Sequence, residues 1–151
     1  MNGSTPGIHF PEDEYYIRRI RFSIYSEMLD ALREAGYHIE DDEYSPNTAV
    51  VEFPVHEPYF MKGKRDVSMW EQLEIAAQYQ HFWADNSVSV TVTFQPEEAD
   101  SLKSALEMYE TRLKAVSFLA YKENGYKQAP YEPITKTQYE KMTKKITPHR
   151  W

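Results

Sequence analysis

Cysteine is absent from the sequence. Without a thiol, the chain can form no disulfide bond, bind no metal through a thiolate and carry no thiol or thiyl-radical chemistry. A long apolar run is absent too, because no stretch approaches the roughly 18 apolar residues that a membrane-spanning helix needs. Residues 1–11 are polar and contain proline, unlike the apolar centre of a signal peptide. A cytoplasmic protein is therefore expected.

Basic residues are outnumbered by acidic ones. The chain has 17 lysines and arginines against 24 aspartates and glutamates, which gives a formal net charge of −7. This balance disfavours general nucleic-acid binding through phosphate neutralisation, although it leaves room for a local basic patch. The remaining composition indicates a folded domain, since 41% of the 151 residues are hydrophobic and 15% are aromatic.

Common catalytic and ligand-binding motifs are missing as well. The five histidines are scattered without the H-E-x-x-H spacing of a zinc site, so no metal site is expected. Gly3 and Gly7 do not form a G-x-G-x-x-G loop, and the chain contains no G-K-[ST]. No Ser-His-Asp set can be assembled from spacing. The residues alone indicate an α/β domain with one polar-faced strand.

The strongest local pattern is a helix that leads directly into a strand over residues 66–94. Ser68 and Glu71 have the S-x-x-E spacing of a capping box, which predicts the start of the helix. Apolar residues then recur at helical spacing. The predicted stripe contains Met69, Leu73, Ala76 and Trp83, widened by Ile75, Tyr79 and Phe82.

From residue 87 the period changes to two, which predicts a strand over Ser87–Phe94. One face carries Val88, Val90, Val92 and Phe94, and the other carries Ser87, Ser89, Thr91 and Thr93. The hydroxyl face either lines a substrate cavity or faces solvent. Asp85 and Asn86, just before the strand, are either polar ligands at a cavity mouth or ordinary turn residues.

The first third of the chain predicts two strands and one helix. Aromatic and branched residues predict a strand over Tyr15–Ser23. Its arginines (Arg18, Arg19 and Arg21) could bind a phosphate or carboxylate, or pair with nearby acidic residues, which is the simpler interpretation. Ser26 is expected to cap a short helix that buries Met28, Leu29 and Leu32 and ends at Gly36. A second strand is expected over Thr48–Val55, where Pro54 indicates a strand end or a sheet edge.

The last third predicts a helix that begins at Pro96, a strand over Ala115–Tyr121 and one short helix near Thr137–Lys144. Strands and helices thus alternate, which favours an α/β fold with parallel or mixed pairing. A free-standing four-stranded α/β domain and an incomplete piece of a larger barrel would both give this order.

The chain resembles one known protein family over nearly the whole length of the chain. The stretch WEQLEIAAQYQHFWADNSVSVTVTF, continued by PEEADSLKSALEMYETRLKAVSFLAY, resembles the C-terminal barrel segment of the adenosylcobalamin-dependent (class II) ribonucleotide reductases. The family pattern there reads approximately W-A-D-N-x-V-S-x-T-V-T-F, then P-E-E, a helix and a V-S-F-L strand. STPGIHFPEDEYYIRRIRF, EMLDALREAGYHIEDDEYSPNTAVVEFPV and YKQAPYEPITKTQYEKM resemble further family segments in the same order.

The resemblance implies a fold, and it implies that the catalytic cysteines belong to another part of the enzyme. The family's catalytic subunit is a ten-stranded α/β barrel that reduces ribonucleotides through a thiyl radical generated with adenosylcobalamin. This chain would be the C-terminal part of that α/β barrel, incomplete on its own. Residues 1–121 would be the barrel segment and residues 122–151 a C-terminal extension. Nothing in the chain matches the family's radical cysteine, its reducing cysteine pair or the Asn and Glu of its finger loop.

The implied role is a C-terminal fragment or split small subunit of an adenosylcobalamin-dependent ribonucleoside-triphosphate reductase, inactive alone. A larger reductase chain with the catalytic cysteines would be its partner, a ribonucleotide the substrate, and adenosylcobalamin a cofactor held mainly by the larger chain. The family's substrate-phosphate loop would end just before residue 1, which suggests a split gene or a deliberately cut chain. The alternatives are a reductase-derived, non-enzymatic module that binds a nucleotide or a protein, and a fragment without function.

The resemblance also implies substrate-binding positions but no catalytic residue. Gly7, Ile8 and His9 would lie near the substrate phosphates. Ser87, Ser89, Ser117 and Phe118 would lie on or near the inner wall of the barrel. Their roles would be shape and hydrogen bonding rather than bond making.

Overall fold

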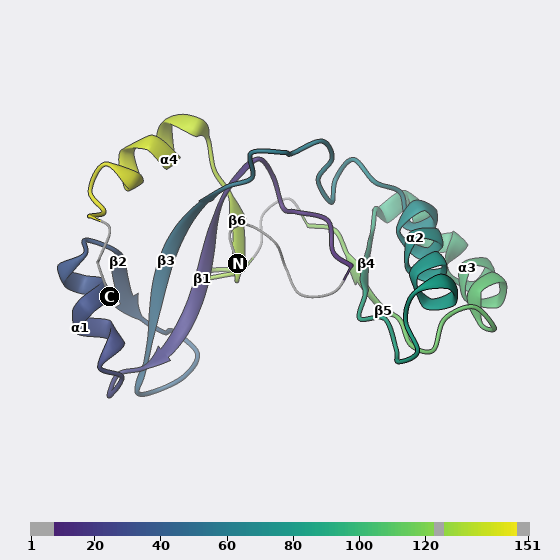
Figure 1. Ribbon diagram of the computed structural model, residues 1–151, viewed down its shortest axis with the longest axis horizontal. Helices are drawn as coiled ribbons and strands as arrows, with labels where there is room; N and C mark the ends of the chain where they lie inside the picture. Colours follow the sequence, from purple (N-terminus) through teal and green to yellow (C-terminus); the bar gives the residue numbers. More distant parts are fainter. Residues whose placement is uncertain (1–7, 123–125, 148–151) are drawn as a thin grey trace. The chain divides into compact units, whose positions relative to one another are not determined.

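The computed structural model describes residues 8–122 and 126–147, which form two compact units. The sheet unit comprises residues 12–59 and 126–147, and the helical unit comprises residues 8–11 and 60–122. Residues 126–147 pack with the first third of the chain. Figure 1 shows the elements of each unit.

The sheet unit is built on a four-stranded antiparallel sheet in the order β2-β3-β1-β6. The strands are β1 (Tyr15–Ser23), β2 (His38–Asp41), β3 (Thr48–His56) and β6 (Tyr131–Pro133). The predictions of β1 and β3 are confirmed, β1 with identical bounds. Pro54 lies in the part of β3 beyond its pairing with β2, so its missing N–H costs no ladder bond there.

The helix α1 (Met28–Glu34) packs Leu29 and Leu32 against β3. The predicted cap was wrong, because Glu27 is the N-cap residue and no side chain caps the helix. Ser26 uses its carbonyl oxygen instead, which accepts the amide of Leu29 at 3.1 Å. Met28 is 46% exposed, so only two of the three expected positions are buried.

Gly36 ends α1 as predicted. Its φ of +87° lies in the left-handed region, which glycine adopts without the strain of a side chain. The amide of Gly36 bonds the carbonyl of Arg33 at 3.0 Å, and that of Tyr37 bonds the carbonyl of Leu32 at 3.1 Å. This pair of bonds is a Schellman motif, which satisfies carbonyls that the end of the helix leaves free. Further along the unit, α4 (Lys136–Thr143) confirms the predicted C-terminal helix.

The helical unit contains one parallel strand pair, β4 (Thr91–Phe94) and β5 (Ser117–Ala120). Between them run the 3₁₀ helix η1 (Pro96–Ser101) and α3 (Leu102–Tyr109), and α2 (Met69–Phe82) precedes them. Figure 1 shows α2 and α3 beside this strand pair. The core contains Met69, Leu73, Ala76, Ala77, Val90, Val92, Ala105 and Tyr109.

The expected apolar stripe of α2 is too wide. Tyr79 is 50% exposed, Phe82 80% and Trp83 85%, because only the face that carries Leu73 and Ala76 meets the core. The predicted capping box is half formed. The Ser68 hydroxyl accepts the amide of Glu71, as predicted, but the Glu71 carboxylate bonds Lys62.

The predicted α/β class is confirmed, but the strands form two separate sheets. One sheet is antiparallel and the other is a parallel pair, and neither closes into a barrel within residues 8–122 and 126–147. The alternation of strands and helices along the chain did not reveal this arrangement. β2 and β3 pair antiparallel, whereas a crossover connection would have placed neighbouring strands parallel.

Candidate functional site

The parallel pair β4–β5 has one face on the helices and one face away from them. Val92 pairs with Phe118 in register, and both pack toward the core of α2 and α3. Thr91 pairs with Ser117, and successive residues of a strand point to opposite faces. Thr91 and Ser117 therefore share the face away from the helices. Phe118 lies on the other face, edge-on to Phe94 with ring centroids 6.5 Å apart.

Two of the expected inner-wall serines precede the strand. The predicted strand began at Ser87, whereas β4 begins at Thr91, so Ser87 and Ser89 lie in an irregular segment. Both are exposed, and Ser117 is exposed as well. Their hydroxyls are thus accessible to a ligand, although only Ser117 belongs to the strand pair.

The segment of residues 8–11 brings further expected residues to the same place. The amide of Ile8 donates to the carbonyl of Ser89 at 3.0 Å, which sets His9 beside the start of β4. The carbonyl of Pro11 accepts the amide of Lys64 at 3.1 Å. Burial, together with the positive charge of Lys64, lowers the pKa of His9. A neutral imidazole near a cation and exposed hydroxyls can form hydrogen bonds with a polar ligand. Gly7 lies outside the described residues.

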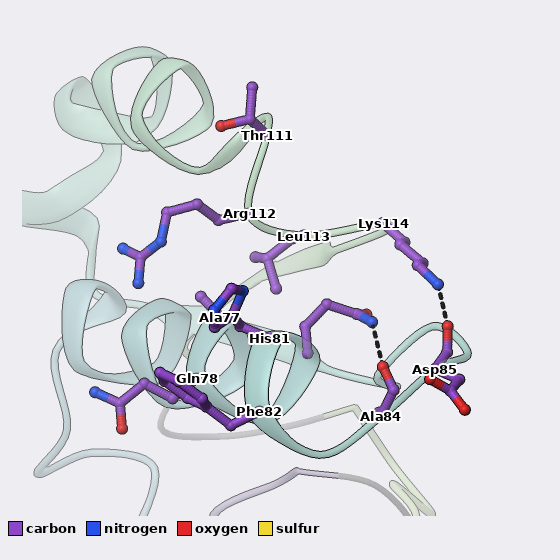
Figure 2. Close-up of a pocket in the computed structure, with 11 residues that line it drawn as sticks. Ala77, Gln78, His81, Phe82, Ala84, Asp85, Thr111, Arg112, Leu113 and Lys114 are labelled. Carbon is purple, nitrogen blue, oxygen red and sulfur yellow. Dashed lines mark hydrogen bonds between the residues drawn. The ribbon is translucent and has the colours of Figure 1, made fainter.

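The residues before β4 behave as turn residues. Lys114 donates to the carbonyl of Asp85, and Gln80 donates to the carbonyl of Asn86 at 2.9 Å. Both residues are held through their backbone, in a bend. A pocket of about 670 Å³ lies beside Asp85. It is lined by the C-terminal part of α2 and by residues 111–114, which follow α3. Figure 2 shows Lys114 turned toward the carbonyl of Asp85. The Gln80 amide also donates to the carbonyl of Ala84 at 3.0 Å, and these bonds close the end of α2.

A polar network joins α2 to the end of α3. The Arg112 guanidinium binds the Glu74 carboxylate at 2.7 and 2.8 Å, and the Tyr109 hydroxyl donates to the same carboxylate at 3.0 Å. The Arg112 and Tyr109 hydrogen bonds lower the pKa of Glu74 to about 2. Burial and the neighbouring Glu74 charge raise the pKa of Tyr109. The network links two helices and leaves the Glu74 carboxylate fully engaged.

Gln72 is a buried polar residue whose role was not predicted from the sequence. Its amide nitrogen donates to the carbonyl of Thr93 at 2.6 Å, and its amide oxygen accepts the Thr93 N–H at 2.9 Å. These two bonds take the place of the hydrogen bonds that a neighbouring strand would form at the edge of β4 that faces away from β5. The available signal was a glutamine in the middle of the buried stripe of α2, which needs hydrogen-bond partners when buried.

The arginine cluster in β1 is used within the sheet unit, as the simpler interpretation predicted. Arg19 pairs with Glu52 at 2.7 Å and with Glu132 at 2.6 Å, and Arg21 pairs with Asp42 at 3.1 Å. Arg18 lies over the ring of Tyr131, 5.9 Å from its centroid. These contacts hold β6 and the acidic loop against the sheet.

Within residues 8–122 and 126–147, no group of three or more His, Asp or Glu side chains could hold a metal ion. In the same ranges, no helix has the length and apolarity to cross a bilayer.

Comparison with known proteins identifies where such a segment occurs. The chain is 48% identical, over 147 residues, to the adenosylcobalamin-dependent ribonucleoside-triphosphate reductase of Euglena gracilis. It is 43% identical, over 152 residues, to the probable enzyme of that name from Dictyostelium discoideum. The chain belongs to this family. The alignments cover 95% and 98% of the chain but only 20% of each reductase.

A solved structure agrees with this assignment. The crystal structure of a B12-dependent (class II) ribonucleotide reductase matches 97% of the chain with a TM-score of 0.80 and 41% identity. The match again covers 21% of the longer protein. No protein-family model matches the chain. The chain thus spans about a fifth of the reductases that it resembles, and the predicted family is confirmed.

Proposed function

We propose that this chain is a barrel segment, or a split small subunit, of an adenosylcobalamin-dependent ribonucleoside-triphosphate reductase. It would supply β4 and β5, with α2 and α3 on one face, to a catalytic barrel completed by a larger chain. The observation that carries the proposal is the identity of 40–48% to these reductases, which runs through the whole chain while covering a fifth of theirs. The parallel pair with helices on one face is the unit from which such barrels are built.

The division of labour follows from the missing thiols. Since this chain has no cysteine, the radical and reducing steps would belong to the larger chain. In this proposal Gly7, Ile8 and His9 lie near the substrate phosphates, and Ser87, Ser89 and Ser117 offer hydroxyls to the ribonucleotide. Phe118 would support the wall by packing on the helices, since its ring faces the core. Residues 122–151 would form an extension beyond the barrel segment.

The cofactor would be held mainly by the larger chain. Adenosylcobalamin is much larger than a drug-sized ligand, for which pockets of roughly 300–1,000 Å³ are typical. Two pockets of the helical unit measure about 670 and 290 Å³, and neither is large enough to enclose the cofactor. No step through it is assigned to this chain. A cytoplasmic location is part of the proposal.

Reconstitution tests the proposal. The chain is purified alone and together with the cysteine-bearing reductase chain of the same organism, and each sample is analysed by size-exclusion chromatography with light scattering. We expect a one-to-one complex, and adenosylcobalamin-dependent ribonucleotide reduction in the mixture only. A compact monomer that ignores the larger chain, together with full activity of the larger chain alone, would reject the subunit role.

The alternative is a reductase-derived module that binds a nucleotide or a protein by itself. It is favoured by Gln72, whose amide already satisfies the edge of β4 that a barrel neighbour could use. Calorimetric titration of the chain alone with ATP, CTP, GTP and UTP separates the two roles. Binding to the isolated chain, without any complex with the larger chain, would favour the module.

A further inference from the structure

Helix α4 and the turn that continues it carry a dense group of positive charges. This basic face consists of Lys136, Lys141, Lys144 and Lys145, which are all exposed. Among the described residues, none of these four forms an ion pair, whereas Lys62, Lys103 and Lys127 each bind a glutamate. The basic face therefore keeps its charge in a chain whose net charge is −7.

The opposite side of α4 packs on the sheet unit. The centroid of the Tyr139 ring lies 5.2 Å from that of Tyr15 and 5.9 Å from that of His56. Met142 and Ile146 follow Tyr139 at helical spacing and are half-buried like it. With about 3.6 residues per turn, this apolar stripe and the basic face occupy opposite sides of the helix. The lysines are thus turned toward solvent.

Both ends of α4 are fixed by hydrogen bonds. At the start, the Thr135 hydroxyl accepts the amide of Gln138 at 3.2 Å, and the Gln138 side chain accepts the amide of Thr135 at 2.8 Å. At the other end, the amide of Thr147 donates to the carbonyl of Ala35 at 2.9 Å. The basic face is therefore pre-organised, which lowers the entropy that a partner loses on binding.

The spacing of the lysines does not serve the stability of the helix. Lys136 lies in the first turn, where the positive end of the helix dipole repels a cation and where α4 has no acidic residue. Lys141 precedes Lys144 and Lys145 by three and four residues, the spacings at which like charges destabilise a helix. Binding of an anionic partner accounts for this group of charges.

We propose that the basic face of α4 is a docking surface for an acidic segment of another protein. A helix or extended stretch rich in aspartate and glutamate would set its carboxylates opposite lysines that span about 14 Å of the helix axis. Complementary charges of this kind speed association and select the partner. The inference goes beyond the proposed function, which rests on β4 and β5 of the helical unit, whereas α4 belongs to the sheet unit.

Two other anionic partners fit the basic face less well. A helix that binds a membrane surface buries its apolar side in the lipid, but the Tyr139 side of α4 is already used on the sheet. A nucleic acid is longer than this surface, and the net charge of −7 opposes its approach to the rest of the chain. A short acidic segment can contact the basic face alone.

Binding of a deca-glutamate peptide tests the docking. The fluorescein-labelled peptide is titrated with the whole chain in about 50 mM NaCl, and its anisotropy is measured. We expect saturable binding that weakens as salt is added. Replacement of all four lysines of the basic face by glutamine should weaken it at least about tenfold. The control variant removes the same charge elsewhere, by Lys62→Gln, Lys103→Gln, Lys122→Gln and Lys127→Gln, and should weaken it less than about threefold.

Circular dichroism confirms that both variants fold. Equal losses in the two variants would show that only net charge matters and would overturn the proposal, as would a peptide that does not bind the unmodified chain. Neither outcome bears on the complex with the larger reductase chain, so the proposed function is tested separately.

NMR locates the binding site. On addition of the peptide to the isotopically labelled chain, we expect amide shift changes in residues 136–145 and none in the helical unit. Changes spread over both units would overturn the proposal. A DNA duplex of about 12 base pairs and vesicles that contain phosphatidylserine are titrated in the same way. Tighter binding of either one than of the peptide, lost in the variant of the basic face, would replace the acidic segment by a nucleic acid or a membrane.

Discussion

Two polar side chains of α2 stabilise the helical unit in different ways. Gln72 is buried and bonds only backbone groups, so it completes a strand edge within the core. Glu74 is partly exposed and binds Arg112 and Tyr109, so it links helices through charge. Removing a buried amide leaves its backbone partners without hydrogen bonds, which lowers stability. A partly exposed ion pair depends on the charge of its carboxylate, so its contribution to stability changes with pH.

Replacement of Gln72 tests the first mechanism. Gln72→Ala leaves the buried N–H and C=O of Thr93 without partners, and an unsatisfied buried group costs about 1–3 kcal/mol. We therefore expect the free energy of unfolding to fall by at least about 2 kcal/mol, measured by urea denaturation. Gln78→Ala, at an exposed position of the same helix, is the control and should change it by less than about 0.5 kcal/mol. Similar losses in both variants would contradict the edge-capping role.

Acid titration tests the second mechanism. The pKa of Glu74 is about 2 in the folded chain, against 4.5 without these contacts, so the unfolded state binds the proton more readily. The stabilisation is complete above pH 4.5 and is lost as the pH falls toward 2. Glu74→Gln should flatten this part of the stability profile, measured by urea denaturation between pH 5 and about 2.5. The control is Glu107→Gln, which changes an exposed carboxylate on α3 and should preserve the slope. A Glu74 carboxyl resonance that titrates near 4.5 would refute the assignment.

At the scale of elements, the sequence predicted those whose own residues determine their structure. The aromatic and branched residues of β1 gave its bounds, and the spacing of Ser68 and Glu71 gave the start of α2. The strands β2 and β6 were missed, since charged and proline-bearing segments of four and three residues become strands only by pairing with β3 and β1. Their structure depends on partners distant in the chain.

One residue, Gly36, determines the backbone geometry at the end of α1. A Cβ added at Gly36 would lie 2.2 Å from the carbonyl oxygen of Lys145, and the φ of +87° strains any other residue. Gly36→Ala should therefore lower the free energy of unfolding by more than about 1 kcal/mol, measured by urea denaturation. Glu34→Ala, at an exposed position of the last turn, should be neutral within about 0.5 kcal/mol. A neutral Gly36→Ala would show that the helix end can rearrange.

The candidate site was predictable only in part, for the same reason. The resemblance to the reductases named His9 and Ser89, and the contact between Ile8 and Ser89 brings them together. Neither periodicity nor composition could have paired residues 80 positions apart. The resemblance also named Phe118 beside Ser117, but the two point to opposite faces because strand residues alternate. Gln72 was overlooked because its role appears only when β4 lies against α2.

At the scale of the whole molecule, the proposed docking to a larger reductase chain predicts that the stability of this chain depends on that partner. A partner that binds only the folded chain stabilises it by mass action, by about 2.7 kcal/mol at one hundred times the Kd. We expect the urea midpoint of the chain to rise with the concentration of the larger reductase chain. The midpoint is followed by ¹⁹F NMR of 5-fluorotryptophan at Trp70, which packs against the helical core beside Tyr109.

Two variants of α3 give this last prediction its control, because Leu106 lines an apolar groove of about 290 Å³ between α3 and β5, whereas Met108, which is also exposed, does not. Leu106→Asp should keep the midpoint of the free chain nearly unchanged, since Leu106 is half-exposed, yet it should abolish most of the shift caused by the partner. Met108→Asp should retain the shift. A midpoint of the unmodified chain that does not respond to the larger reductase chain would contradict the proposed docking.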